Sequence, residues 1–444
     1  MSAQPNPGLY KSIKKNFVSP LYVPSIVWET FRVSADLRHI AFVSRADGRQ
    51  CVIVDGIEGE QFDGIGMGTI TFSPDGKRVA YVAGEDGRQL VVVDEQQGQR
   101  YDLTLKGSLV FSPDSQHIAY GARKGNQWCV VLDSKEGELY DEVYDLTFSP
   151  DSKHLAYCAA RDERAWLIVD GQRASEFEYV VLPVYSPNSQ RLACVAYQGD
   201  KSVVVVDGKA GNKCDGILHG TMTFSPDSRQ FAYAAQIDND QFVVRNGFAD
   251  KRYQGVLGEL VFSPDSQHLL YAANDGRNQF MVLDGKPCRL FDYIVSGQNE
   301  LFSPDSRRFA YVVKQGNSQY VVFDEQTGNP FDGVGGETVA FSPDSRRTAF
   351  VARIAQTWFV VVDRKIERKS PEPLVKASFS PDSQHFVYAT RAERSSIVIL
   401  DETPIFKAEN IVNASRAGFL FDSTSTFHFL ALVSGAVHSI DIEL

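Results

Sequence analysis

The sequence predicts an all-β fold, a β-propeller of about eleven four-stranded blades in one ring. Three observations lead to this prediction. A motif of the form [FY]-S-P-[DN]-[SG] recurs along the chain of 444 residues. Successive copies lie 37 to 40 residues apart, and no linker interrupts them. Each repeat also contains four short runs rich in β-branched and aromatic residues, which favour strands over helices.

The motif copies fix the number of repeats. Nine clear copies open on an aromatic residue, at Phe72, Phe111, Phe148, Tyr185, Phe224, Phe262, Phe302, Phe341 and Phe379. A weaker copy, "VSADLRHIAF", begins at Val33, and a degenerate one, "FDSTSTFHFLAL", begins at Phe421. The chain therefore contains eleven repeats of about 39 residues.

Within a repeat the four runs are expected to form strands A, B, C and D. In the third repeat they read "GSLVF", "HIAYGA", "WCVVLD" and "ELYDEV". Proline fixes φ in the A-to-B turn, and Asp and Ser favour turn positions. Asp-Gly or Asn-Gly after strand C supplies the positive φ angles of a tight hairpin. One blade exposes two apolar faces, which stacking with its neighbours buries.

The two ends of the chain are expected to meet in the last blade. The final repeat ends at Leu444 after strand C, so its strand D is missing. Residues 17–23, "FVSPLYV", form a spare extended stretch that could supply it. We therefore expect residues 1–16 to be a tail and residues 17–444 to be a single propeller closed by strand 17–23. Two tandem propellers of five and six blades are the alternative.

The motif [FY]-S-P-D-[SG]-x-x-[apolar]-A-[YF] resembles the WD-repeat-like propeller repeat of the TolB type. The resemblance extends over about residues 30–434, and it implies the fold of the blades. Strand C ends in Val-Asp or Leu-Asp rather than the Trp-Asp of true WD repeats. No export signal or separate domain precedes the repeats, so the resemblance does not imply a periplasmic location.

Composition indicates a folded, soluble protein with an acidic surface. Hydrophobic residues make up 43% and charged residues 23%, and no apolar run is long enough to insert in a membrane. The net charge of −11 disfavours nucleic acid as a partner. The six cysteines form no C-x-x-C pair, and most replace an apolar residue in a strand. We therefore expect buried thiols, no metal site and a reducing, cytoplasmic location.

The repeats provide a test for catalytic residues, because a catalytic residue should break the internal pattern. Five histidines share one register before strand B, and Arg occupies it in four other repeats, so we interpret this position as a solvated strand start. The two sets are His39, His117, His154, His268 and His385, and Arg78, Arg191, Arg308 and Arg347. His219, His428 and His438 are isolated, with no partner implied.

The aspartates fail the same test. Asp63, Asp102, Asp141, Asp215, Asp292 and Asp332 share one register, expected in strand D. A paired-carboxylate mechanism needs two carboxylates in different environments, so this uniform series suggests recurring hydrogen bonds. No G-x-S-x-G or H-E-x-x-H occurs. The sequence predicts no enzyme activity and no cofactor.

These observations favour a non-enzymatic scaffold that binds a protein or peptide partner through its loop-bearing face. A ligand- or sugar-binding or enzymatic propeller with a site at the central channel is one alternative, and a purely structural ring is another. The B-to-C loops vary most between repeats, as recognition surfaces do. Trp128 and Trp358 stand beside these loops in a register where Gln fills half of the places. We predict that at least one of them contacts the partner, and packing against a neighbouring blade is the competing interpretation.

Overall fold

The computed structural model describes residues 9–21, 26–295, 302–335, 338–370, 375–392, 395–412 and 418–444. The named elements in these ranges are β-strands. No helix in them is long and apolar enough to cross a membrane. The chain divides into two compact units, Val23–Arg252 and a second unit that combines Met1–Tyr22 with Tyr253–Leu444. Whether the blades form a single ring depends on how these two units are arranged, so the single ring stays a prediction.

The unit Val23–Arg252 contains six sheets in its described residues, and each is one blade. Blade 1 comprises β2 (Ile26–Val33), β3 (Ile40–Ala46), β4 (Arg49–Val54) and β5 (Ile57–Glu58). Blade 2 comprises β6 (Gly64–Ile65), β7 (Thr71–Phe72), β8 (Val79–Glu85), β9 (Arg88–Val93) and β10 (Gln96–Gln97). Blade 3 comprises β11 (Leu103–Thr104), β12 (Val110–Phe111), β13 (Ile118–Lys124), β14 (Gln127–Leu132) and β15 (Lys135–Glu136). Blade 4 comprises β16 (Glu142–Phe148), β17 (Leu155–Arg161), β18 (Arg164–Val169) and β19 (Gln172–Phe177). Blade 5 comprises β20 (Tyr179–Tyr185), β21 (Leu192–Gln198), β22 (Lys201–Val206) and β23 (Lys209–Ala210). Blade 6 comprises β24 (Gly216–Ile217), β25 (Thr223–Phe224), β26 (Phe231–Ile237), β27 (Asp240–Arg245) and β28 (Phe248–Ala249).

The second unit contains five sheets in its described residues. Blade 7 comprises β29 (Gly255–Phe262), β30 (Leu269–Asn274), β31 (Gln279–Leu283) and β32 (Lys286–Pro287). Blade 8 comprises β33 (Tyr293–Ile294), β34 (Ala310–Gln315), β35 (Ser318–Phe323) and β36 (Gln326–Thr327). Blade 9 comprises β37 (Gly333–Val334), β38 (Ala340–Phe341), β39 (Thr348–Ile354), β40 (Thr357–Val362) and β41 (Lys365–Ser370). Blade 10 comprises β42 (Val375–Phe379), β43 (Phe386–Ala392), β44 (Ser395–Leu400) and β45 (Thr403–Ala408). Blade 11 comprises β46 (Asn410–Val412), β47 (Leu420–Phe421), β48 (Thr426–Val433), β49 (Ala436–Glu443) and β1 (Ser12–Pro20). The eleven blades confirm the predicted β-propeller and its antiparallel strand order.

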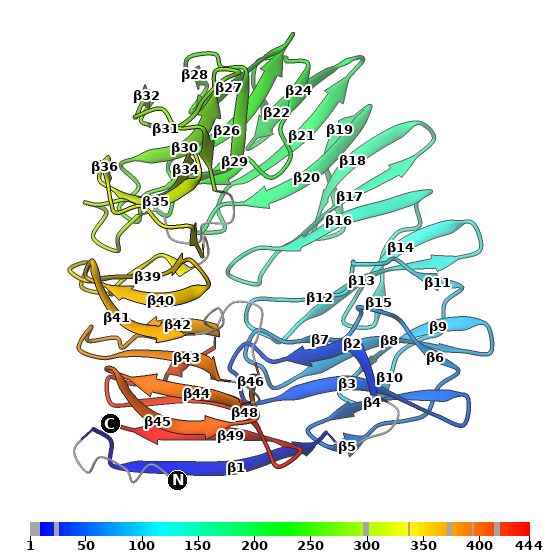
Figure 1. Cartoon of the computed structure of the whole chain (residues 1–444). Coiled ribbons are helices and arrows are strands. Elements are labelled where there is room, and N and C mark those ends of the chain that lie inside the picture. Colours follow the sequence, from blue (N-terminus) through cyan, green and yellow to red (C-terminus); the bar gives the residue numbers. More distant parts are fainter. Residues whose placement is uncertain are drawn as a thin grey trace. The chain divides into compact units, whose positions relative to one another are not determined.

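The last blade joins the two ends of the chain (Figure 1). Strand β1 pairs with β49 in antiparallel register, from Ser12 opposite Glu443 to Pro20 opposite Ala436. This corrects the predicted bounds, because the strand lies at residues 12–20 rather than 17–23 and part of the expected tail belongs to the sheet. The reason is that β1 is an edge strand. It carries polar residues such as Lys14 and Lys15, so apolar content did not mark where it begins.

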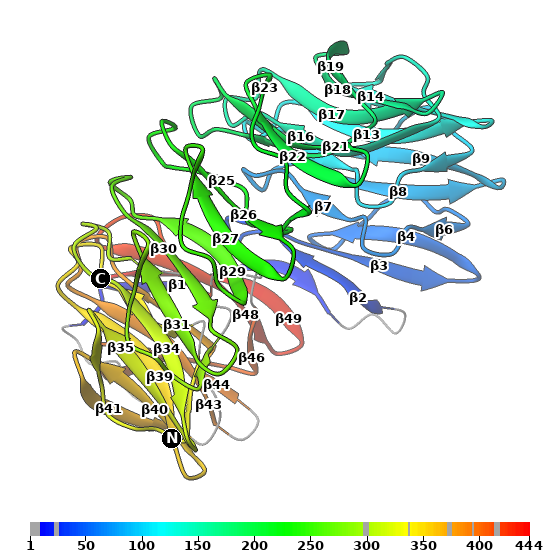
Figure 2. The same cartoon turned by 90° about the horizontal axis from the view of Figure 1, so that it is seen from above.

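The core lies between successive blades, where the sheets of each unit stack one on the next (Figure 2). Within each unit, every pair of consecutive blades shares an apolar cluster of described residues. Between blades 1 and 2, for example, Val52 and Phe62 pack against Tyr81, Leu90 and Val92. Blades inside a unit are therefore stabilised by the neighbours that they stack against.

The motif forms the turn between strands A and B. The Ser73 hydroxyl donates a hydrogen bond to Asp75 Oδ1 at 2.6 Å and accepts one from the backbone N–H of Arg78 at 2.9 Å. The same serine hydroxyl contacts recur in other blades, for example at Ser112. Hydrogen bonds within the motif therefore stabilise the turn, because the serine hydroxyl bonds a backbone N–H in place of a backbone acceptor.

The fifth motif residue also joins one blade to the next. Ser115 has φ of 66°, in the left-handed region that glycine favours, and Gly76 fills this position in blade 2. The hydroxyl of Ser115 accepts a hydrogen bond from the backbone N–H of Asp75 in the preceding blade at 3.0 Å. The same bond joins Asp114 to Ser152, Asp151 to Ser189, Asn188 to Ser228, Asp265 to Ser306, Asp305 to Ser345 and Asp344 to Ser383. Serine is therefore used despite its backbone strain because glycine could not make this bond.

Candidate functional site

Where the shared register holds His or Arg, the side chain contacts an aspartate of the same blade. His117 Nδ1 lies 2.6 Å from Asp133 Oδ2, while Asp133 Oδ1 accepts the backbone N–H of Ile118. In blade 2 the same positions hold Arg78 and Asp94, whose Nε and Oδ2 are 2.8 Å apart. Our interpretation of a solvated strand start was therefore incomplete. These side chains are partly exposed, and they tie the start of strand B to the end of strand C.

The aspartate register corrects the predicted position of strand D. Strand D is short in most blades, as at β5, and Asp63 lies beyond it. Its carboxylate accepts the backbone N–H of Asp86, in the hairpin between strands B and C of blade 2, at 2.9 Å. The equivalent bond joins Asp102 to Gly125, Asp141 to Asp162, Asp215 to Asp238, Asp292 to Gly316 and Asp332 to Ala355. These carboxylates form the recurring hydrogen bonds that the sequence predicted.

The glutamine register that surrounds Trp128 and Trp358 has a structural role of its own. Gln50 Oε1 accepts the backbone N–H of Ile65, in strand A of the next blade, at 2.8 Å. Gln89, Gln279 and Gln319 make the same bond to Thr104, Ile294 and Val334. A tryptophan in this register cannot accept such a bond, because its indole nitrogen only donates.

The structure places Trp128 and Trp358 in equivalent surroundings in different units. Each indole is partly buried and lies beside an arginine on the paired strand. The guanidinium carbon lies 5.8 Å from the ring centroid for Arg123 and Trp128, and 5.6 Å for Arg353 and Trp358. Trp128 also packs against the apolar cluster between blades 3 and 4. The structure does not bring the two residues together within one unit, and their contact with a partner stays a prediction.

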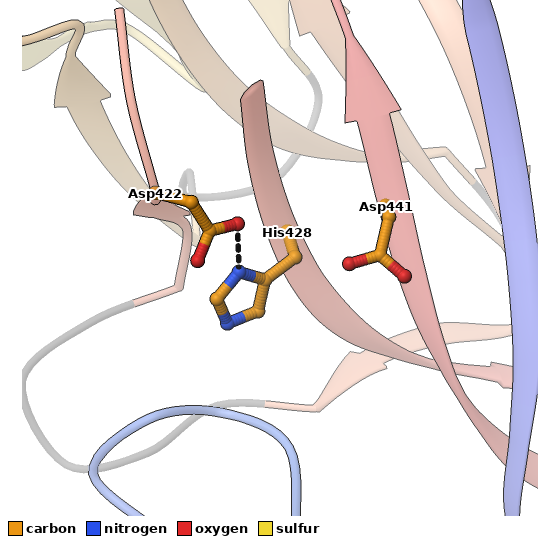
Figure 3. Close-up of side chains that lie close together, drawn as sticks. All are labelled: Asp422, His428 and Asp441. Carbon is orange, nitrogen blue, oxygen red and sulfur yellow. Dashed lines mark hydrogen bonds and ion pairs between the residues drawn. The ribbon is translucent and has the colours of Figure 1, made fainter.

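One polar cluster in blade 11 has the composition of a metal site (Figure 3). The ligand atoms of Asp422, His428 and Asp441 lie within 4.8 Å of one another. His428 is 3% exposed, and its Nδ1 lies 2.8 Å from Asp422 Oδ2, so this nitrogen donates to a carboxylate. Asp441 Oδ2 accepts from Asn16 on β1. His428 thus has the partner that sequence reasoning did not assign, and we interpret the cluster as a hydrogen-bonded contact beside β1.

Three tyrosines form a continuous ladder on blades 4 and 5. The ring centroids of Tyr144 and Tyr179 are 5.6 Å apart in a stacked arrangement, and those of Tyr179 and Tyr197 are 5.7 Å apart. Tyr179 is 43% exposed and Tyr197 is 36% exposed. Because Tyr179 pairs with Tyr197, at the end of strand B, both lie at the edge of blade 5 that carries its B-to-C hairpin. In any blade, we call the edge that carries the B-to-C hairpin the hairpin edge.

Two carboxylates lie near Tyr179. Burial is the largest cause that raises the pKa of Tyr179, and the negative charges of Glu142 and Asp145 raise it further. Both residues are exposed, and Asp145 Oδ2 also accepts the backbone N–H of Leu182 in blade 5 at 2.8 Å. The ladder therefore combines flat aromatic surface with negative charge.

Two cavities lie against blade 5. One has a volume of about 410 Å³ and lies between blades 4 and 5, with Leu167, Tyr185 and Cys194 among its walls. The other has a volume of about 180 Å³ and lies between blades 5 and 6, with Cys214, Tyr233 and Phe242 among its walls. Blade 5 contributes to both, with Leu192, Cys194 and Val205 of its strands B and C in the first cavity and Cys214, beyond its strand D, in the second.

The signal for both cavities was present in the sequence. Cys194 occupies a strand B register that holds Tyr81, Tyr120, Tyr157 and Tyr233 in other blades. Cys214 occupies a register that holds Phe62, Tyr101, Tyr140, Phe291 and Phe331. The sequence predicts that both cysteines are small buried side chains, and both are buried. The cavities follow only from the aromatic residues that these cysteines replace.

No protein-family model and no curated protein matches this chain. Among solved structures, the chain is similar to one described as the eukaryotic initiation factor, at 12% identity over 83% of this chain and 94% of that one, with a TM-score of 0.38. It is also similar to the Dos1 propeller, at 12% identity over 75% of this chain and 90% of that one, with a TM-score of 0.33. A third is TolB from Acinetobacter baumannii, at 15% identity over 64% and 65% of the two chains, with a TM-score of 0.27. Propellers and TolB are thus among the structures that the chain resembles, as the motif suggested, and the fold assignment itself rests on the eleven blades.

Proposed function

We propose that this chain is a non-enzymatic β-propeller scaffold that binds a protein or peptide partner at the hairpin edges of blades 4 and 5. The observation that carries the proposal is the ladder of Tyr144, Tyr179 and Tyr197, in which Tyr144 is half-buried and Tyr179 and Tyr197 are exposed. Tyrosine offers a large, rigid contact surface with a polar tip, and it is enriched at the centre of protein interfaces. The ladder therefore gives the variable loops beside it an anchoring surface.

The repeats support this choice of surface. The register of Tyr197 holds Arg45, Gly84, Arg123, Ala160, Gln236, Asn274, Lys314, Arg353 and Arg391 in the other blades that carry the motif. Tyr197 is the aromatic exception in this set, and it lies directly against the exposed Tyr179. Tyr197 thus differs from the equivalent residues of the other blades and does not fill the core, as we expect of a residue that recognises a partner.

The charges beside the ladder indicate the chemistry of the partner. Glu142 and Asp145 lie close enough to Tyr179 to affect its pKa. A lysine or arginine side chain can bind the face of an aromatic ring and pair with a neighbouring carboxylate at once. We propose that the partner presents a basic side chain to this surface. Trp128 and Trp358 remain proposed contacts at the hairpin edges of their own blades.

Selection of displayed random peptides against the immobilised full chain tests the proposal. We expect enrichment of sequences that contain Arg or Lys, and loss of at least tenfold in affinity with Tyr179→Ser or Tyr197→Ser. Tyr293→Ser is the matched control, because Tyr293 occupies the register of Tyr179, is 46% exposed and pairs with Lys314 instead of a second tyrosine. Peptides that bind all three variants as well as the parent chain would contradict the proposed surface.

A further inference from the structure

A buried aromatic ring closes the junction between blades in one recurring register. The ring belongs to the end of one blade and meets an aromatic ring on strand B of the next. In four junctions the two rings meet edge to face, with centroids 5.7 to 6.4 Å apart: Phe62 with Tyr81, Tyr101 with Tyr120, Phe291 with Tyr311, and Phe331 with Phe350. The four residues that supply the first ring are 1% to 6% exposed. We call the space between two blades that this ring fills the socket of the junction.

The junction between blades 5 and 6 has the same socket, but the chain supplies no aromatic ring to fill it. Cys214 replaces the first aromatic residue, and its Sγ donates to the carbonyl oxygen of Ser202 at 3.3 Å. Tyr233 still occupies the position of the second ring, on the far wall. Between them lies the cavity of about 180 Å³. The bridge that positions the missing ring is retained, because Cys214 pairs with Ser202 as Phe62 pairs with Gln50.

The cavity walls have the chemistry of an aromatic site. Tyr233, Ala235, Phe242 and Val244 form its apolar lining, and Lys213 and Arg252 belong to its exposed part. Burial raises the pKa of the Cys214 thiol, so this side chain is uncharged at neutral pH. An apolar cavity of about 150 Å³ in another protein accepts benzene, so this volume is sufficient for one six-membered ring.

We propose that the cavity between blades 5 and 6 binds one aromatic ring supplied by a ligand, in the position that Phe62 and its equivalents occupy elsewhere in the chain. The ring would meet Tyr233 edge to face, as the internal rings meet their partners. A small phenolic compound and an aromatic side chain of a peptide share this chemistry. The site lies outside the tyrosine ladder, so it does not depend on the proposed function.

Titration of the full chain with p-cresol, followed by ligand-observed NMR and calorimetry, tests the proposal. We expect saturable binding of one equivalent, at about millimolar affinity or tighter. Cys214→Phe restores the internal ring and should reduce the affinity at least tenfold. Cys214→Leu, a smaller filling side chain, serves the same purpose if the phenylalanine variant does not fold. Tyr179→Ser should leave p-cresol binding unchanged, which separates this test from that of the partner surface.

A second arm opens an equivalent socket. Phe331→Cys removes the ring between blades 8 and 9, so this variant should bind two equivalents of p-cresol if it remains folded. N-acetyltyrosinamide distinguishes the two sources of the ring. Its binding supports a peptide side chain, and binding of p-cresol alone supports a small phenolic compound. Absence of saturable p-cresol binding, or a folded Cys214→Phe chain that binds like the parent, would overturn the proposal.

Discussion

At the scale of single residues, the fifth motif position balances backbone strain against a bond between blades. Ser152 has φ of 64° and is 6% exposed, and its hydroxyl accepts the backbone N–H of Asp114 at 2.9 Å. A left-handed residue other than glycine is strained by about 1–3 kcal/mol, and an N–H that loses its partner in such a part-buried contact costs about 1–3 kcal/mol. The hydrogen bond is therefore large enough to offset the strain, which is consistent with serine being commoner than glycine here.

This balance predicts an unusual order of substitutions at Ser152. Ser152→Ala loses the hydrogen bond and keeps the strain, so it should lower the free energy of unfolding by about 2 kcal/mol. Ser152→Gly also loses the bond but relieves the strain, so its cost should be smaller by about 0.5 kcal/mol. Urea denaturation of the two variants measures the difference. A glycine variant less stable than the alanine variant would show that strain is unimportant at this turn.

A second residue-scale prediction concerns pH. The hydrogen bond that the His39 ring donates to the Asp55 carboxylate is the largest cause that raises the pKa of His39 above 6.5, and burial opposes it. The folded state thus favours the protonated ring, so this stability is present below pH 6.5 and is lost as the pH rises through the raised pKa. His39→Gln should cost about 0.5 kcal/mol at acidic pH, because the pair is partly exposed, and less at about pH 8.5.

Arg78→Gln is the control for this pH dependence. Arg78 makes the equivalent pair with Asp94, and its guanidinium stays charged throughout this pH range. The cost of Arg78→Gln should therefore be constant where that of His39→Gln falls. Equal pH profiles for the two variants would exclude titration of His39 as the cause.

At the scale of the elements, the local pattern was predictable from the sequence and the contacts between blades were only partly so. The turns and strands B and C follow from residues adjacent in sequence, such as Pro74 and Asp75, and they were predicted correctly. Asp63, at the end of one repeat, accepts a hydrogen bond from a hairpin residue 23 positions later. Local strand chemistry does not reveal this contact, so the sequence pattern placed Asp63 in strand D. The Cys214 cavity depends on Tyr233 in the next repeat, and only a comparison of registers could have predicted it.

Strand β1 gives a prediction for an element. Deleting residues 1–21 removes the hydrogen bonds that β1 makes along β49, from Glu443 to Ala436. Strand β49 would become an unpaired edge, and such edges exchange amide hydrogens readily and promote association. We expect faster hydrogen exchange in β49 and a melting temperature lower by several degrees. Deleting residues 1–8, which precede the strand, is the control and should have little effect. Unchanged exchange in β49 after the longer deletion would contradict the pairing.

At the scale of the whole molecule, one ring of eleven blades and two propellers of six and five blades would unfold differently. A blade in a closed ring is stabilised through both faces, so loss of any blade weakens the rest. We predict one ring and therefore one cooperative unfolding transition. The four tryptophans offer a local measurement, because Trp28, Trp128 and Trp166 lie in the unit Val23–Arg252 and Trp358 lies in the other unit.

Trp358→Phe leaves fluorescence that reports on the unit Val23–Arg252 alone, while circular dichroism follows the strands of the whole chain. For one ring, the two signals should share one midpoint in denaturant. Deletion of residues 1–21 in this background should then lower the fluorescence midpoint as well, although β1 belongs to the other unit. Two independent propellers would instead leave the fluorescence midpoint in place while circular dichroism shows an earlier transition for the unit that has lost its edge strand.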